Sequence, residues 1–206
     1  MPSWRIHLKW ARCYGIREEI AEFANRLIDE PQNVSALRAS GLYQILRSIG
    51  KGHDWGKKSK SLRGIQKAFI RQLYGEEGVM AVELHHLLDY IAYLCDPRKL
   101  AREEVFKKIS QGTAGIHLPQ RIEVIREVLR NEKVKEKIKE LTIKYAEHSP
   151  NKDFIIKRLE KKASEEGIRR SVLRFAILHL NEILADIRSD DLTNVQHLTY
   201  NLNPQI

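Results

Sequence analysis

Apolar residues recur at helical spacing along almost the whole chain, and this pattern constrains the fold more than any other feature. One clear stripe follows Ile16 and consists of Ile20, Phe23, Ala24, Leu27 and Ile28. Spacing of three and four residues places such side chains on one face of an α-helix, whereas a strand would alternate with a period of two. We therefore expect an all-α protein.

The first 97 residues carry five such segments. They are expected near Trp4–Arg12, 16–28, 37–49, 62–73 and 79–94, with breaks at Gly50 and Gly52, near Gly75 and at Pro97. The third segment would deliver His53 and Asp54 at its carboxyl end. We interpret residues 1–97 as a core of about five helices.

Residues 98–206 have stronger outward charge but the same helical period. The expected helices lie near Leu100–Ile109, Ile122–Leu129, Val134–Tyr145, Phe154–Ala163 and Val172–Ile187. The last of them is the most apolar, so we expect it to pack back on the first half. The prediction is a helical extension on the core, within one compact domain.

Charge favours a polyanionic partner. The 206 residues carry a net charge of +9 with an isoelectric point near 9.5. Basic residues cluster between positions 51 and 71, where Asp54 is the only acid. The cluster comprises Lys51, Lys57, Lys58, Lys60, Arg63, Lys67 and Arg71. A phosphorylated small molecule or a nucleic acid is the expected partner.

Other features point to a cytoplasmic protein. The most apolar stretch, Val79 to Cys95, is interrupted by charged residues and does not reach the roughly 18 apolar residues of a membrane span. The amino terminus lacks a secretory signal pattern, and the two cysteines, Cys13 and Cys95, do not form a disulfide framework. Abundant Lys, Glu, Arg and Ile would suit a heat-adapted organism.

One short segment indicates a chemical site and not only packing: Gly52-His53-Asp54-Trp55-Gly56-Lys57. An imidazole next to a carboxylate offers nitrogen and oxygen to one divalent cation. Two ligands alone hold a metal weakly, so further donors are required. Lys57 follows closely and can supply positive charge to a phosphate.

The sequence His53-Asp54-Trp55-Gly56-Lys57 resembles the core motif of the HD superfamily of metal-dependent phosphohydrolases. The resemblance implies an HD-type helical bundle, an upstream histidine ligand and a late aspartate ligand. It also implies a phosphatase or phosphodiesterase that uses Mn²⁺, Mg²⁺, Fe²⁺, Co²⁺, Ni²⁺ or Zn²⁺. The alternative is a basic helical nucleic-acid-binding protein in which the motif is structural or vestigial.

Candidates for the remaining ligands lie on both sides of the motif. His7 is the only upstream histidine. Downstream, His85, His86 and Asp89 share a helix at spacings of three and four, which suits joint metal binding. Asp89 is favoured because a carboxylate among apolar residues needs a partner. Asp96 is a close rival on the same face, and Asp186 ranks third.

The resemblance also suggests roles for these residues. Asp54 would bind the metal and orient the attacking water, while His85 or His86 would move a proton. Lys57, Lys58 and Arg63 would hold phosphate charge. The pair His85-His86 resembles the additional histidines of HD families that bind two metals, so the expected number of ions is one or two.

Overall fold

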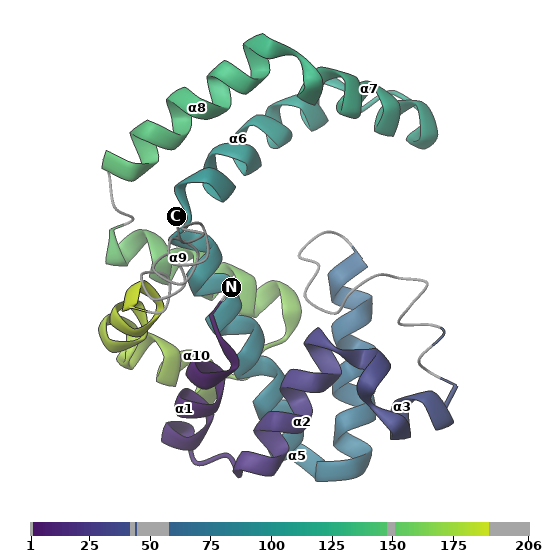
Figure 1. Cartoon of the computed structure of the whole chain (residues 1–206), viewed down its shortest axis with the longest axis vertical. Helices are drawn as coiled ribbons and strands as arrows, with labels where there is room; N and C mark the ends of the chain where they lie inside the picture. Colours follow the sequence, from purple (N-terminus) through teal and green to yellow (C-terminus); the bar gives the residue numbers. More distant parts are fainter. Residues whose placement is uncertain (1, 42–43, 45–57, 148–150, 190–206) are drawn as a thin grey trace, which may run out of the picture. The chain divides into compact units, whose positions relative to one another are not determined.

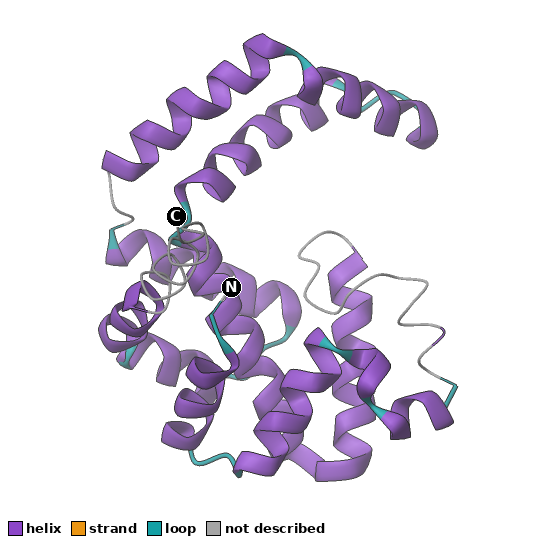
Figure 2. Cartoon of the chain, in the orientation of Figure 1, coloured by secondary structure: helices purple, strands orange, loops and turns teal. Residues whose placement is uncertain are grey.

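The structure is a computed structural model that describes residues 2–41, 44, 58–147 and 151–189. All regular secondary structure in these ranges is helical, and they contain no strand (Figure 2). The expected all-α class is confirmed. None of the described helices combines the length and apolar character that a membrane crossing requires.

Figure 1 shows the order of the described helices along the chain. In the amino-terminal part the elements are α1 (Trp4–Tyr14), α2 (Glu18–Asp29), the 3-10 turn η1 (Pro31–Asn33), α3 (Ser35–Ala39) and α5 (Lys58–Leu94). They are followed by α6 (Pro97–Gly112), α7 (Leu118–Arg130), α8 (Glu132–Glu147), α9 (Lys152–Glu166) and α10 (Arg170–Leu178). After a turn at His179, residues 180–189 are again helical.

Helix α5 is two helices joined at a sharp bend. Gly75 has φ 61° and ψ −146°, a conformation open to glycine and strained for other residues. Three residues later, a Cβ atom on Gly78 would lie 2.8 Å from Ile70 Cγ1, so the second arm passes close to the first. The two arms correspond to the separate helices expected on either side of Gly75. Of the expected helix at 37–49, only residues 37–41 and 44 are described, and α3 ends within them at Ala39.

The chain divides into two compact units. Unit 1 comprises residues 1–90 and 158–206, and unit 2 comprises residues 91–157. The carboxyl-terminal helices therefore belong with the first ninety residues, and the chain between them forms a unit of its own.

Unit 1 buries aliphatic side chains from the two ends of its sequence, including Ile20, Leu27, Leu88, Val172 and Ile183. Helix α10 contacts α1 through Phe175, whose ring lies 6.1 Å from Trp10 and 4.9 Å from Tyr14, both edge to face. The helical segment after it contributes Asp186, which accepts hydrogen bonds from Lys9 Nζ at 2.6 Å and Trp10 Nε1 at 3.0 Å. The apolar segment near residues 172–187 thus packs on the first helix.

Unit 2 contains a small core between α6 and α8, which lie side by side (Figure 1). Ala101, Val105 and Leu141 are buried there. Partly buried residues around them are Ile109, Leu129, Val134, Ile138 and Tyr145. At the edge, Tyr145 donates a hydrogen bond to Glu104 at 2.8 Å, tying α8 to α6.

Candidate metal centre

Two predicted ligands, His7 and Asp89, meet inside unit 1 with His85, for which the sequence suggested proton transfer. His7 comes from α1, while His85 and Asp89 lie one turn apart on α5 and therefore share a face. Each offers one ligand atom, and these atoms all lie within 4.8 Å of one another. The three residues are only 2–3% exposed. We call His7, His85 and Asp89 the metal group.

Hydrogen bonds orient both imidazoles of the metal group. His7 Nδ1 donates to the carbonyl oxygen of Ser3 at 3.1 Å, and His85 Nδ1 donates to Asn25 Oδ1 at 2.8 Å. In the neutral ring with its hydrogen on Nδ1, Nε2 carries a lone pair, as a metal-binding histidine requires. These Nε2 atoms and both oxygens of Asp89 are buried without a hydrogen bond.

Two distances within the metal group lie close to those between ligand atoms of a single ion. His7 Nε2 lies 3.5 Å from Asp89 Oδ1, and His85 Nε2 lies 3.3 Å from Asp89 Oδ2. Around an ion with bonds of about 2.1 Å, adjacent ligand atoms are about 3.0–3.4 Å apart in octahedral and tetrahedral geometry. The two rings stack with centroids 4.0 Å apart and planes inclined by 18°, so they approach Asp89 side by side.

The metal group contains one buried carboxylate, whose negative charge requires a positive charge nearby. Burial lowers the pKa of His7, and the neighbouring His85 lowers it further. Burial also disfavours charge on His85, yet Asp29 and Asp89 together raise its pKa to about 9. Although burial raises the pKa of Asp89, the two imidazoles hold it well below the ordinary value. A proton on His85 or a divalent ion therefore balances the buried carboxylate.

Helix α2 supplies a second carboxylate that the sequence analysis missed. Asp29 Oδ1 lies 3.7 Å from His85 Nε2, and Asp29 Oδ2 accepts a hydrogen bond from Trp4 Nε1 at 2.7 Å. Asn25 and Asp29 are four residues apart, so both side chains reach His85 from one face of α2. That spacing was the available signal, but an apolar stripe on the same helix suggested only packing.

Space beside the histidines is small. A cavity of about 10 Å³ is bounded by His7, Ala11, Ala21, Asn25, Ala81, Leu84 and His85. This volume is close to the minimum for one water molecule. It suits an ion or a water and is far too small for a substrate.

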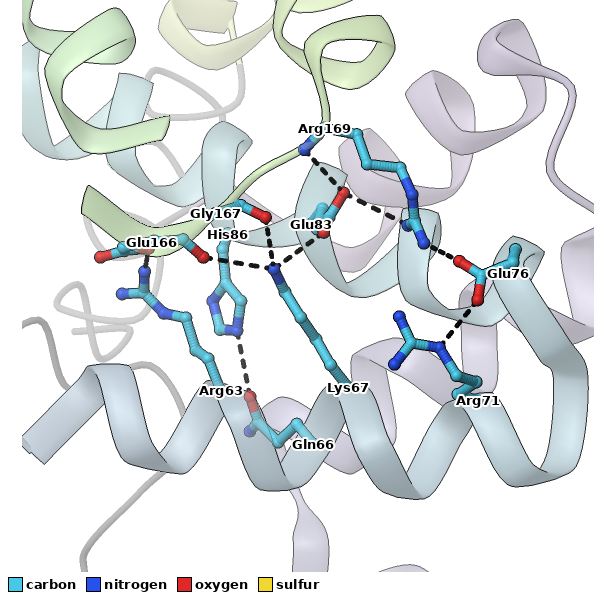
Figure 3. Close-up of polar contacts among 10 residues, drawn as sticks. All are labelled: Arg63, Gln66, Lys67, Arg71, Glu76, Glu83, His86, Glu166, Gly167 and Arg169. Carbon is cyan, nitrogen blue, oxygen red and sulfur yellow. Dashed lines mark hydrogen bonds and ion pairs between the residues drawn. The ribbon is translucent and has the colours of Figure 1, made fainter. Parts of the chain in front are cut away.

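His86 is turned toward a different partner. Its Nε2 lies 3.1 Å from Gln66 Oε1 on the first arm of α5 (Figure 3). Burial, and next the charge of Arg63, keep the pKa of His86 well below its ordinary value, so the ring is neutral. Its ring is perpendicular to that of His85, with centroids 5.7 Å apart. His86 is therefore not part of the metal group.

The other candidate aspartates serve different contacts. Asp96 precedes α6 and accepts hydrogen bonds from the backbone nitrogens of Arg98 at 2.9 Å and Lys99 at 3.3 Å, as a helix N-cap does. Asp186 pairs with Lys9 and Trp10, as described above. Asp89 is the aspartate that joins the two histidines.

The motif residues His53, Asp54 and Lys57 lie outside the described residues, and Lys58 is the first residue of α5. Their predicted roles stay predictions.

Arg63 belongs to a buried ionic network in unit 1 (Figure 3). Its side chain is 3% exposed and forms an ion pair with Glu166, which also pairs with Lys162. Lys67 binds Glu83 at 2.8 Å and donates to the carbonyl oxygens of Glu166 and Gly167 at the end of α9. Burial lowers the pKa of Arg63 to about 10, against the opposing effect of Asp89. The guanidinium of Arg63 thus already pairs with a carboxylate. Its predicted phosphate-binding role stays a prediction.

Comparison with known proteins gives no relative: no protein-family model, curated protein or solved structure matches this chain.

Proposed function

We propose that this chain is a metal-dependent phosphohydrolase whose ion is held by His7, His85 and Asp89. The observation that carries the proposal is the convergence of two Nε2 atoms on a buried carboxylate, with both Nδ1 hydrogens donated elsewhere. The mixed nitrogen and oxygen donors suit Mn²⁺, Fe²⁺, Co²⁺, Ni²⁺ and Zn²⁺ better than Mg²⁺, which prefers oxygen.

Residues around the ion would have distinct tasks. A bound divalent cation lowers the pKa of a coordinated water and neutralises charge that develops on a phosphoryl oxygen. Ser3 and Asn25 fix the two imidazoles through their Nδ1 hydrogens, and Asp89 supplies the opposing charge. His53 and Asp54 would add donors to the ion, with Asp54 orienting the water. Lys57 and Lys58 would hold the phosphoester of a nucleotide or nucleic acid.

The nucleic-acid-binding alternative depends on free cations after the motif. Two of these, Arg63 and Lys67, pair with Glu166 and Glu83 inside unit 1. Cations that are already paired contribute less to binding the phosphates of a nucleic-acid backbone. This favours the enzyme hypothesis over the nucleic-acid-binding alternative. Tight burial of the metal group favours a third function, a structural ion that stabilises unit 1 without catalysis.

Metal analysis and hydrolysis assays separate these functions. We expect the metal-free protein reloaded with Mn²⁺ or Zn²⁺ to bind the ion and hydrolyse bis(p-nitrophenyl) phosphate. Asp89→Asn should keep the fold and lower metal affinity by more than about tenfold, because it removes the charge that holds the ion. The double variant with His53→Ala and Asp54→Ala should lose hydrolysis.

Suitable controls are Asp186→Asn, whose carboxylate pairs with Lys9 and Trp10, and His117→Gln, which belongs to unit 2. Both should retain metal and activity. Unchanged metal affinity in Asp89→Asn would overturn the metal group itself. Metal binding without hydrolysis of phosphomonoesters or phosphodiesters would leave the structural ion as the function, and metal-independent, salt-sensitive binding to single-stranded nucleic acid would favour the alternative.

A further inference from the structure

A second site is contained entirely within unit 2. A cavity of about 800 Å³ opens there, a volume typical of small-molecule sites. The residues around it are Tyr93, Lys99, Arg102, Glu103, Phe106, Leu129, Lys135, Ile138 and Lys139. All of them belong to residues 91–157, so the cavity is independent of the metal group.

Helix periodicity explains how this cavity is built. Lys99, Arg102, Glu103 and Phe106 are spaced by three, four and seven residues, which places them on one face of α6. On α8, the corresponding face carries Lys135, Ile138 and Lys139. The neighbouring face of α6 holds Ala101 and Val105 in the unit 2 core. The cavity therefore lies beside that core, with Leu129 and Ile138 contributing to both.

The cavity has an apolar floor. Phe106, Leu129, Ile138 and the ring of Tyr93 line it, and Phe106 is 49% exposed although it is a large apolar side chain. The lining contains no Ser, Thr, Asn or Gln. Its single acid, Glu103, accepts a hydrogen bond from the Tyr93 hydroxyl at 3.0 Å. A hydrocarbon matches such a surface better than a base or sugar, whose polar edges would lack partners.

The rim of the cavity is cationic. Lys99, Lys135 and Lys139 form exposed pairs with Asp96, Glu132 and Glu136, at 3.6, 2.6 and 2.9 Å. Exposed pairs of this kind are weak and exchange readily. Among the described residues, no carboxylate lies within ion-pair distance of Arg102, which lines the cavity between Lys99 and Phe106. A guanidinium can bind a carboxylate through two parallel hydrogen bonds.

We propose that unit 2 binds a fatty-acid-like anion, an acyl chain that ends in a carboxylate. The chain would lie along Phe106, Leu129 and Ile138, and the carboxylate would pair with Arg102, supported by the lysines. The volume, the apolar floor and the opposite charge of the rim together specify this class of ligand.

Isothermal titration of the full chain with decanoate, below its micelle-forming concentration, tests the site. We expect one decanoate per chain, with decanol and decyltrimethylammonium binding at least about tenfold more weakly because they lack the negative charge. Arg102→Gln should weaken decanoate binding by about tenfold or more. Lys107→Gln, which removes one charge from α6 away from the cavity, should change it less than about twofold.

Phe106→Ala tests the apolar floor separately from the charge. Because Phe106 is half exposed, its truncation should leave the circular dichroism spectrum unchanged while weakening decanoate binding. The proposal is overturned if decanoate does not bind, if decanol binds equally well, or if Arg102→Gln and Lys107→Gln have equal effects. Displacement of decanoate by single-stranded oligonucleotides, with tighter binding of the latter, would identify a nucleic-acid surface instead.

Discussion

At the scale of single residues, the metal group and the ionic network each contain a buried carboxylate, and its charge is balanced differently in the two places. Asp89 is balanced by a proton on His85 or by an ion, and both states are accessible because the pKa of His85 is raised to about 9 in the ion-free protein. Binding of a metal at neutral pH would then displace that proton. Glu166, by contrast, is balanced permanently by Arg63 and Lys162.

Glu166→Gln should be strongly destabilising. Glu166 is 6% exposed, and its removal leaves the buried guanidinium of Arg63 with no anion in this contact (Figure 3). Breaking a buried pair typically lowers the free energy of unfolding by about 3 kcal/mol or more. Urea denaturation followed by tryptophan fluorescence measures the loss.

Its neighbour Glu165 is the matched control, because it is 56% exposed and lies 3.9 Å from exposed Lys161. Glu165→Gln should change the free energy of unfolding by less than about 0.5 kcal/mol. Equal effects of the two substitutions would mean that the buried pair contributes nothing beyond an ordinary surface contact.

At the scale of the helices, Asp96 illustrates how one residue type serves two purposes. A carboxylate near the end of a helix rich in histidines resembles a metal ligand in sequence. In the structure it caps the next helix, with Pro97 in its first turn. Local backbone geometry therefore accounts for Asp96 without an ion.

Substitutions at Asp96 should separate capping from metal binding. Asp96→Ala should lower the free energy of unfolding by about 1 kcal/mol, because the backbone nitrogens of Arg98 and Lys99 lose their acceptor. Asp96→Asn should retain most of the stability, since asparagine also caps helices. Metal content should be unchanged in both variants, and a loss of metal in either would return Asp96 to the ligand set.

Helix α5 positions the site through its bend. Gly75 reverses the chain, so that Gln66 and Lys67 on the first arm face His86 and Glu83 on the second (Figure 3). The second arm then presents His85 and Asp89 toward α1 and α2. One glycine thereby allows a single stretch of helix to contribute to two polar clusters.

At the scale of the whole molecule, the division into two units has a measurable consequence. All three tryptophans, Trp4, Trp10 and Trp55, fall within the residue ranges of unit 1. Tryptophan fluorescence therefore reports unit 1, whereas circular dichroism at helical wavelengths reports both units. The two signals allow the stability of each unit to be followed in the intact chain.

Metal should stabilise unit 1 selectively. At a concentration of about 100 times Kd, a ligand that binds only the folded state adds about 2.7 kcal/mol. For a protein of this size we expect the fluorescence midpoint to rise by roughly 5–10 °C. Chelation should reverse the shift, and the circular dichroism transition of unit 2 should not move. Equal shifts in both signals would show that the two units unfold as one.

The sequence by itself determined the all-α class and the break at Gly75, and it singled out His7, His85 and Asp89, with His7 and Asp89 as ligands and His85 as a proton-transfer residue. These follow from local rules: apolar spacing defines a helical face, glycine permits a left-handed bend, and a carboxylate in an apolar stripe needs a partner. His85 and Asp89 could be paired because they are one turn apart on the same helix.

Only the tertiary structure decided which distant residues share a site. It brought Asn25 and Asp29 to His85, directed His86 to Gln66, placed Arg63 against Glu166 and grouped residues 158–189 with the first helices. Helical periodicity states which face of a helix is buried but not which helix covers it. That choice depends on how whole faces pack together, and the direction of each buried polar side chain follows from the partner that packing provides.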